Sequence, residues 1–441
     1  PPGLGGPPPG FYALDERLVL DYVAAKPELA SRLGGPGARG RWAAREVGDG
    51  NINYVYVVSD PGSGAAVVVK QGLPYVRCIG EAMPLSQERA EYEVKALRAT
   101  HALCPEHVPE VFLCDEPMGV MAMRYIEPPH AILRGLLIKG ETFPVLAKHM
   151  GHFLAATLFQ TSALALGGAS FRKAAVEFGP NEAMCELTES VIFTEPYYDA
   201  PNNRHTSPHL DEASAWLRTD VGLKSAVCAL KRRFMECRQA LLHGDLHTGS
   251  VMVTATSTFC IDPEFAFYGP MGFDVGAFLG NLLLCFFSLD GLEAGGAPRG
   301  AQRAWVKACF AETWAVFRAE FLARWGEAVA SGEGEGTRAE AFGAAAPGGP
   351  ASLEEAQEEY MRALWADSLG FAGCKMIRRI VGVAHVADLE TIEPPEARAA
   401  CEARALRLAR RLVVKAGELA TPEDVLAAAE QEREGAIVLS G

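Results

Sequence analysis

The sequence has no excess of basic residues and no cysteine pairing pattern, and each lack excludes a class of protein. Its 441 residues carry 41 Lys and Arg against 55 Asp and Glu, a formal net charge of −14. A nucleic-acid-binding protein needs excess positive charge on one face, so we expect no nucleic-acid partner. The 11 cysteines are scattered, without a C-x-x-C pair or a Cys/His cluster at zinc spacing. This indicates reduced cysteines in a cytosolic or organelle-matrix protein.

Long hydrophobic runs are also missing. The longest run, residues 275–289, is too short to cross a bilayer and contains Asn281, so we expect a buried core helix and no membrane partner. Residues 1–13 are rich in Pro and Gly and show no secretory signal, and we expect them to form a disordered tail. We therefore expect a cytoplasmic protein. An organelle leader stays open as an alternative because the sequence does not begin with Met.

The first part of the chain has the pattern of a small sheet. Apolar residues make up 49% of the sequence, enough for a large core. Residues 14–33 have helical apolar spacing. Two β-branched runs within 53–71 flank an Asp-Pro-Gly-Ser-Gly turn, which predicts a hairpin. A helix is predicted over 86–103 and two further strands within 108–126, so residues 41–126 should form a sheet-rich lobe with one helix.

The rest of the chain is mostly helical in pattern. From about residue 143 onward, the exception is a predicted hairpin around 251–262. Residues 327–352 are rich in Gly, Ala and Glu and are typical of an exposed, low-complexity insertion. Helical segments are predicted over 223–242, 353–386, 395–416 and 422–434.

A glycine-rich turn and a lysine in the small lobe suit phosphate binding. The stretch "EVGDGNINYVYVV" places Gly48, Gly50 and Asn51 just before a strand. Glycines let backbone N–H groups approach phosphate oxygens closely, although the same residues also make an ordinary turn. Lys70 ends the next strand, where a lysine is either a solvated edge residue or a ligand of the α- and β-phosphates.

An acidic helix follows Lys70. One of its glutamates could position the lysine, and the sequence leaves the choice open among Glu88, Glu91 and Glu93.

The stretch "HGDLHTGSVMV", residues 243–253, contains the central acidic residue. Asp245 lies in a loop just ahead of a short apolar strand, where an aspartate can accept the proton of an attacking hydroxyl. We assign His243 to bracing this loop. For His247, a substrate-facing and a structural role are held as equal alternatives.

A second acidic pair follows the hairpin. Asp262 and Glu264 flank Pro263 at a strand end, and two carboxylates so placed suit a hard cation such as Mg²⁺. Asp-Pro-Glu alone could be an ordinary turn. The order of glycine turn, strand lysine, loop aspartate and Asp-x-Glu is that of nucleotide kinases, so the joint pattern predicts a phosphotransfer site.

An arginine pair near the C-terminus is flanked by apolar residues in "CKMIRRIVGVAHV". Because neighbouring helix residues point in different directions, at least one of Arg378 and Arg379 should face the interior. A buried arginine needs an anionic partner, either a carboxylate in a structural salt bridge or a phosphate. We favour phosphate, which matches the forked guanidinium. For Asp274, near a helix start, we favour capping or bracing a loop.

The motifs together resemble a known family. The segments are "GDGNINYVYVV", "VVVKQGLPYVRC", "HGDLHTGS", "IDPEFAFYGPMGFDVGAFLGN" and "MIRRIVGVAHVADLE". They resemble the 5-methylthioribose kinases, in the aminoglycoside phosphotransferase and choline kinase branch of the protein-kinase-like fold. Ser250 stands where the wider family usually has a metal-binding Asn, and Asp-Pro-Glu replaces Asp-x-Asp or Asp-Phe-Gly. This departure matches methylthioribose kinases, and it leaves open whether Ser250 touches a metal.

The resemblance implies an α+β, two-lobed fold: a small, mainly antiparallel N-terminal lobe over 14–126 and a large helical C-terminal lobe over 127–441. It implies ATP and Mg²⁺ as cofactors, phosphorylation of the carbon-1 hydroxyl of 5-methylthioribose in methionine salvage, and a homodimer. Asp245 would be the base, Asp262 and Glu264 the metal ligands, and Arg378 and Arg379 substrate-binding residues beside Asp245. The expected ATP-binding residues are Gly48, Gly50, Asn51, Lys70, the hinge Arg124, Tyr125 and Ile126, and Asp262, Pro263 and Glu264.

Two alternatives remain at this stage. One is a kinase of another small alcohol, such as choline, homoserine or an aminoglycoside. The other is a nucleotide-binding scaffold without catalysis, which would be expected to have lost Lys70, Asp245 or Asp262.

Overall fold

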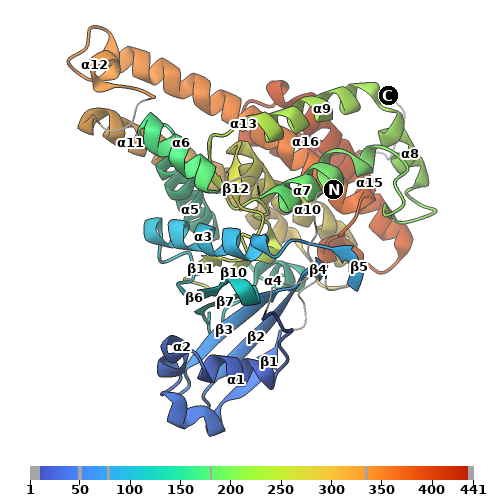
Figure 1. Ribbon diagram of the computed structural model, residues 1–441. Helices are drawn as coiled ribbons and strands as arrows, with labels where there is room; N and C mark the ends of the chain where they lie inside the picture. The colour runs from blue at the N-terminus through green and yellow to red at the C-terminus, as the bar shows by residue number, and fades with distance from the viewer. Residues whose placement is uncertain (1–9, 48–51, 77–79, 179–180, 333–335, 436–441) are drawn as a thin grey trace.

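A computed structural model describes residues 10–47, 52–76, 80–178, 181–332 and 336–435 (Figure 1). Its strands are β1 (Ala43–Glu46), β2 (Asn53–Ser59), β3 (Ala66–Gly72), β4 (Tyr75–Val76), β5 (Gly80–Pro84), β6 (Val111–Asp115), β7 (Val120–Arg124), β8 (Ala131–Ile132), β9 (Ala240–Leu242), β10 (Val251–Val253), β11 (Thr258–Cys260) and β12 (Phe267–Gly269). Its α-helices are α1 (Leu18–Ala24), α2 (Pro27–Arg32), α3 (Glu88–Leu103), α4 (Leu133–Lys139), α5 (Leu146–Gln160), α6 (Gly168–Glu177), α7 (Glu182–Phe193), α8 (Asp211–Thr219), α9 (Val221–Glu236), α10 (Gly272–Ala294), α11 (Gly300–Ser331), α12 (Ala339–Phe342), α13 (Gly349–Val381), α14 (Ala387–Glu390), α15 (Pro395–Val414) and α16 (Pro422–Glu434). Short 3-10 helices are η1 (Pro36–Arg41), η2 (Glu116–Met118), η3 (Glu195–Tyr197), η4 (Thr248–Ser250) and η5 (Ala416–Glu418).

A five-stranded antiparallel sheet in the order β1-β2-β3-β7-β6 forms one end of the molecule (Figure 1). The predicted hairpin is β2 and β3, whose turn closes with a hydrogen bond of 2.8 Å from the Gly64 amide to the Asp60 carbonyl. One face of the sheet buries Tyr56, Val58 and Val69 against α1 and α2. Alternating β-branched residues therefore produce the sheet that the sequence predicts.

The helix predicted over 14–33 is two short helices. Pro27 is the first residue of α2 and Lys26 before it is extended, with φ −108° and ψ 103°. A proline disfavours helical backbone in the residue that precedes it, so the chain bends there.

The remainder of the chain is mainly helical and lies at the other end of the molecule (Figure 1). Its centre is α10, which packs along α13. Glycines let the two helices approach closely: a Cβ on Gly276 would lie 2.3 Å from the Ser368 carbonyl oxygen, and one on Gly280 would lie 3.1 Å from that of Ala372. Since α13 also carries the arginine pair, this contact sets where those arginines stand relative to α10.

The predicted core helix 275–289 lies within α10, which is longer than the apolar run. Among the described residues, this one helix is long and apolar enough to span a membrane, and 83% of its most apolar window is buried inside the protein. The ten cysteines that the structure describes are free thiols, in line with the reduced state expected for them.

One further helical prediction and the predicted exposed insertion differ from the structure. The segment predicted as helix over 223–242 ends as α9 at Glu236, and Ala240–Leu242 is strand β9, paired with β12. A three-residue apolar run cannot be assigned to helix or strand from periodicity alone. Within the Gly/Ala-rich segment 327–352, residues through Ser331 continue α11 and α13 already begins at Gly349.

Candidate active site

Lys70 on β3 lies between two carboxylates. Its Nζ is 2.8 Å from Glu93 Oε2 on α3, and it also donates to Asp262 Oδ1. Of the three glutamates that the sequence left open, Glu93 is the partner: it is buried, whereas Glu91 pairs with Lys95 at 2.6 Å. Burial alone lowers the pKa of Lys70, but the charges of Asp262, Glu93 and Glu264 outweigh it and raise that pKa. Lys70 is therefore a fixed cation that joins the sheet to the segment after β11.

Glu264 is held from the same side by two polar residues. Asn53 Nδ2 on β2 donates to its Oε2 at 2.8 Å, and Arg89 Nε on α3 lies 3.6 Å from the same oxygen. Arg89 also donates to Asn53 Oδ1 at 2.8 Å, so the three side chains form one buried network. One ligand atom each from Glu93, Asp262 and Glu264 lies within 4.8 Å of the others.

Asp262 has unusual backbone geometry. Its φ is 70°, in the left-handed region that non-glycine residues rarely adopt. The side chain is 47% exposed while that of Glu264 is buried, so Asp262 is the solvent-facing member of the group. Burial alone raises the pKa of Asp262, and the Lys70 charge and hydrogen bond outweigh it and lower that pKa.

The loop that carries Asp245 is fixed by α10. Asp274, in the first turn of that helix, accepts hydrogen bonds from the backbone N–H groups of His243 at 2.6 Å and Gly244 at 3.0 Å. Gly244 has φ 83°, and a Cβ there would lie 2.1 Å from the Phe265 carbonyl oxygen, so only glycine fits. His243 Nε2 lies 2.9 Å from the Ile261 carbonyl oxygen. The structure thus places both Asp274 and His243 as braces of this loop.

Asp245 is surrounded by nitrogen atoms. Its Oδ1 accepts from Lys375 Nζ at 3.0 Å, and its Oδ2 lies 3.3 Å from His247 Nε2 and 3.8 Å from Arg379 Nη2. Burial alone raises the pKa of Asp245, but the charge of Lys375 and its other neighbours lower it well below its usual value. Burial lowers the pKa of His247 to about 3 despite its contact with Asp245. At neutral pH the site therefore holds an ionised aspartate and a neutral His247.

Arg378 and Arg379 are both buried. The apolar residues on either side predicted this for at least one of them. Arg378 and Arg379 each donate to the carbonyl oxygen of Ala384, at 3.2 and 2.8 Å. Burial lowers the pKa of Arg379, and the neighbouring charge of Arg378 lowers it further. Arg378 and Arg379 share one carbonyl oxygen, and the nearest carboxylate to Arg379 is Asp245, at 3.8 Å. Their positive charges are therefore only partly balanced by these contacts.

A third arginine stands beside this pair. Arg134 on α4 lies 3.0 Å from Asp388 Oδ2 and donates to Asn281 Oδ1 at 2.9 Å. It is close enough to Arg378 and Arg379 to lower their pKa values, so it adds to the positive charge near Asp245.

The other predicted residues are placed as follows. The expected hinge follows β7: Arg124 is its last residue and donates its backbone N–H to the Glu110 carbonyl at 2.8 Å, and Ile126 is buried. Ser250 Oγ donates to the Asp245 carbonyl oxygen at 3.1 Å, which fixes the loop from its other end. Gly48, Gly50 and Asn51 lie outside the described residues.

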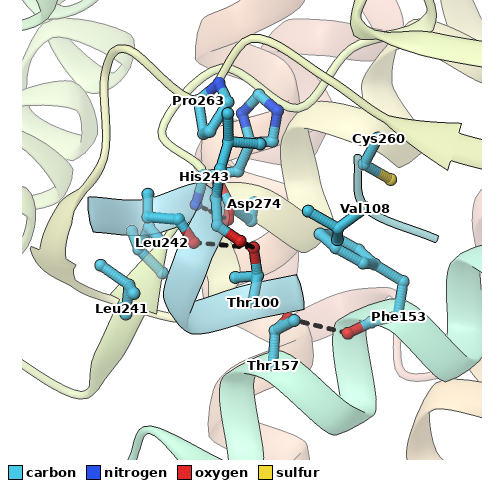
Figure 2. A pocket seen from close by; sticks show the side chains of 12 residues that line it. Thr100, Val108, Phe153, Thr157, Leu241, Leu242, His243, Cys260, Pro263 and Asp274 are labelled. Atoms are coloured by element: carbon cyan, nitrogen blue, oxygen red, sulfur yellow. Dashed lines mark hydrogen bonds between the residues drawn. The ribbon is translucent and has the colours of Figure 1, made fainter. Parts of the chain in front are cut away.

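Pro263 lines a mostly apolar cavity behind the Asp245 loop, with His243 and Asp274 (Figure 2). The opposite walls come from α3 and α5, where Thr100, Phe153 and Thr157 point into it. Lys70, Asp245, Asp262 and Glu264 do not line this cavity, so it is separate from the group of predicted site residues.

Sequence reasoning missed Lys375, Asn53 and Arg89. A signal for Lys375 was present: it precedes Arg379 by four residues in an apolar helical run, and residues so spaced lie on one face of a helix. Asn53 stands beside the glycine-rich turn in the sequence, but the sequence gives no reason to pair it with Glu264. Arg89 gave no signal, because an arginine in an acidic helix is ordinarily a surface residue.

The site and the comparisons agree on a class. The family model described as "Phosphotransferase enzyme family" matches residues 43–342, which include Lys70, Asp245 and Asp262. The fold and this residue set define a small-molecule phosphotransferase.

Curated relatives narrow the class. Methylthioribose kinase 1 from Oryza sativa subsp. japonica is 48% identical over 405 residues, 92% of each chain. Methylthioribose kinase 2 from the same plant is 46% identical, over 95% of each chain. Methylthioribose kinase from Escherichia coli O45:K1 is 41% identical, over 96% of this chain and 98% of the relative. The chain belongs to the methylthioribose kinase family.

Proposed function

We propose that this protein transfers the γ-phosphoryl group of ATP to the carbon-1 hydroxyl of 5-methylthioribose, giving 5-methylthioribose 1-phosphate. The observation that carries the proposal is Asp245, an ionised loop carboxylate held by Lys375 and Arg379, in a chain that also has the Lys70–Glu93 pair. Relatives named methylthioribose kinase, one of them 48% identical over 92% of each chain, support the substrate.

Asp245 is suited to position the hydroxyl. Its pKa lies well below the usual value, so at neutral pH it is ionised and can accept a hydrogen bond. Such a carboxylate is a weak base, but phosphoryl transfer with a loose transition state needs positioning more than early proton removal. The proton moves to Asp245 late, as the oxygen–phosphorus bond forms.

Lys375, Arg378 and Arg379 stabilise the transferring group. All three are buried, and three cations around one carboxylate at the end of α13 form a pre-organised positive field. Negative charge spreads over the equatorial oxygens of the phosphoryl group during transfer, and Arg379 can fork to two of them. We assign these cations to the acceptor side.

Lys70, fixed by Glu93, is assigned to the α- and β-phosphates of ATP, and the backbone of Arg124, Tyr125 and Ile126 to the adenine. Gly48, Gly50 and Asn51 are assigned to the phosphates from the sequence alone. Pro263, between Asp262 and Glu264 in the chain, is assigned to the nucleotide side with them.

The carboxylate group fits Mg²⁺. Hard cations take oxygen ligands, and Asp262 is half-exposed toward solvent beside Glu264. Asn53 and Arg89 both contact Glu264 Oε2, so Oε1 is the oxygen that a metal ion would use. A bound Mg²⁺ would neutralise phosphate charge, and Lys70 would release Asp262 to it. From the resemblance we also infer that the protein is cytoplasmic, acts in methionine salvage and forms a homodimer. Analytical ultracentrifugation tests the dimer.

The test is ADP release from ATP and Mg²⁺ with 5-methylthioribose, ribose, choline, homoserine and kanamycin. We expect turnover with 5-methylthioribose alone. Turnover with another of these alcohols would keep the kinase mechanism and overturn the substrate. Nucleotide binding without turnover on any of them would favour the scaffold.

A further inference from the structure

A cluster of histidines shares no residue with the candidate active site. His107 is in the loop between α3 and β6, and His149 and His152 are on one face of α5, three residues apart. The His107 ring centroid is 4.8 Å from that of His149 and 5.7 Å from that of His152. Three of the chain's ten histidines therefore meet where residues of α5, the α3–β6 loop and β11 converge.

Two of these rings are held in the manner of metal ligands. His107 Nδ1 lies 2.9 Å from the carbonyl oxygen of Thr258, and His152 Nδ1 lies 2.7 Å from Glu320 Oε2. Each contact fixes the ring through Nδ1 and makes Nε2 the atom available to a metal. A carboxylate behind a histidine is the usual second partner of a zinc-binding imidazole.

A third ligand is already next to them. Glu106 Oε1 lies 3.4 Å from His152 Nε2, and one ligand atom each from Glu106, His107 and His152 lies within 4.8 Å of the others. Glu106 is 54% exposed on its side chain and His107 is buried, so the group opens to solvent on one side. Solvent access supplies both an entry path and a water as fourth ligand.

We infer that Glu106, His107 and His152 form a binding site for one zinc-class divalent ion, separate from the phosphotransfer site and independent of the proposed function. Two imidazoles and one carboxylate suit Zn²⁺, whereas Mg²⁺ prefers oxygen ligands throughout. The ligands come from two segments, Glu106-His107 and α5, so the spacing of residues along the chain gives no sign of them.

The site would join two parts of the molecule. The loop at His107 follows α3, the helix that presents Glu93 to Lys70, and its carbonyl already accepts from the Cys260 amide of β11 at 2.8 Å. An ion that joins the His107 loop to α5 would fix the C-terminal end of α3 against α5. The predicted consequence is thermal stabilisation by Zn²⁺, because a ligand that binds only the folded chain raises Tm.

The experiment is calorimetric titration of the full chain with ZnCl₂ in excess Mg²⁺ and without nucleotide. We expect one Zn²⁺ per wild-type chain, loss of that binding in His152→Gln, and an affinity lower by about 10- to 100-fold in Glu320→Gln, which removes only the supporting carboxylate. Both side chains are about a third exposed, so these variants should fold. Basal Mg²⁺-dependent turnover should be unchanged in both.

His209→Gln is the matched control, because His209 also faces a glutamate, Glu396 at 3.4 Å, but has no second histidine in that contact. It should bind Zn²⁺ as the wild type does and show the same rise in Tm. Absence of stoichiometric binding in the wild type would overturn the inference and leave an ordinary His–Glu ion pair. Binding that survives in His152→Gln would overturn it too, by assigning the ion to cysteines or to His243 and His247.

Discussion

The two halves of the candidate active site carry opposite charge. Around Lys70, three carboxylates (Glu93, Asp262 and Glu264) face two cations, Lys70 and Arg89. Around Asp245 the excess is reversed: Lys375, Arg378, Arg379 and Arg134 face two carboxylates, Asp245 and Asp388.

This difference shows what each half is built to hold. A surplus of carboxylate oxygens attracts a cation, and a surplus of buried cations attracts an anion. The first half therefore suits a metal–nucleotide complex, and the second suits the phosphoryl group as it arrives at the acceptor. Four variants would break or sharpen this comparison.

Replacing Asp245 should have the largest effect. Asp245→Asn keeps the shape but cannot take the hydroxyl proton, so turnover should fall by about 10²- to 10⁴-fold while ATP affinity is unchanged. Steady-state kcat and nucleotide binding by calorimetry measure the two. Near-normal turnover would remove Asp245 from its assigned role.

Removing the arginine pair should come next. Replacing Arg378 and Arg379 together by Met should lower kcat by roughly 10²-fold or more, through lost charge stabilisation, and change the affinity for ATP much less. Circular dichroism is needed beside the kinetics. An unfolded double variant would instead show that the pair is a structural element of α13.

Lys375→Met should give a smaller loss and a new pH dependence. The positive charge of Lys375 opposes the effect of burial on Asp245, so the pKa of Asp245 should rise without it. Because the ionised form is active, kcat should then fall as pH falls through the raised pKa. Profiles between about pH 5 and pH 9 test this, with exposed Lys224→Met as the control. An unchanged profile would mean that Lys375 does not set the ionisation of Asp245.

The smallest effect is expected on the nucleotide side. Glu264→Gln keeps one oxygen for a metal but removes a charge, so the Mg²⁺ concentration for half-maximal rate should rise by about tenfold. Titration of turnover with MgCl₂ measures it, and Glu91→Gln, on the same helix as Glu93, is the control. Unaltered Mg²⁺ dependence would exclude Glu264 as a ligand.

The nucleotide half was largely predictable from the sequence, and the acceptor half only partly. Lys70 lies within strand β3, which runs past the predicted end to Gly72, and Asp262 and Glu264 follow the end of β11. The local pattern indicates their positions, and the chain order of these motifs is diagnostic. The choice of Glu93 was not predictable, because it depends on how α3 is rotated against the sheet. That rotation is set by the packing of Val94 and Leu97, which are buried in the main core.

Around Asp245, the aspartate and the arginines were predictable from the sequence, but their arrangement was not. Lys375 was overlooked because a lysine in a helix is usually solvent-exposed, and its burial follows from the crossing of α13 with α10. The strand at 240–242 was missed for the same kind of reason: it exists only because β12 pairs with it. Long-range contacts decide both.

The position of α10 has a consequence for heat inactivation. Asp274 of this helix holds the loop of Asp245, and Gly276 and Gly280 of the same helix set the approach of α13 with its cations. The loop of Asp245 and the cations of α13 are thus both positioned by α10, a helix that is buried from Gly272 to Leu289. On warming, enzymatic activity and the folded state should disappear in a single transition, with no temperature range in which an intact protein is already inactive.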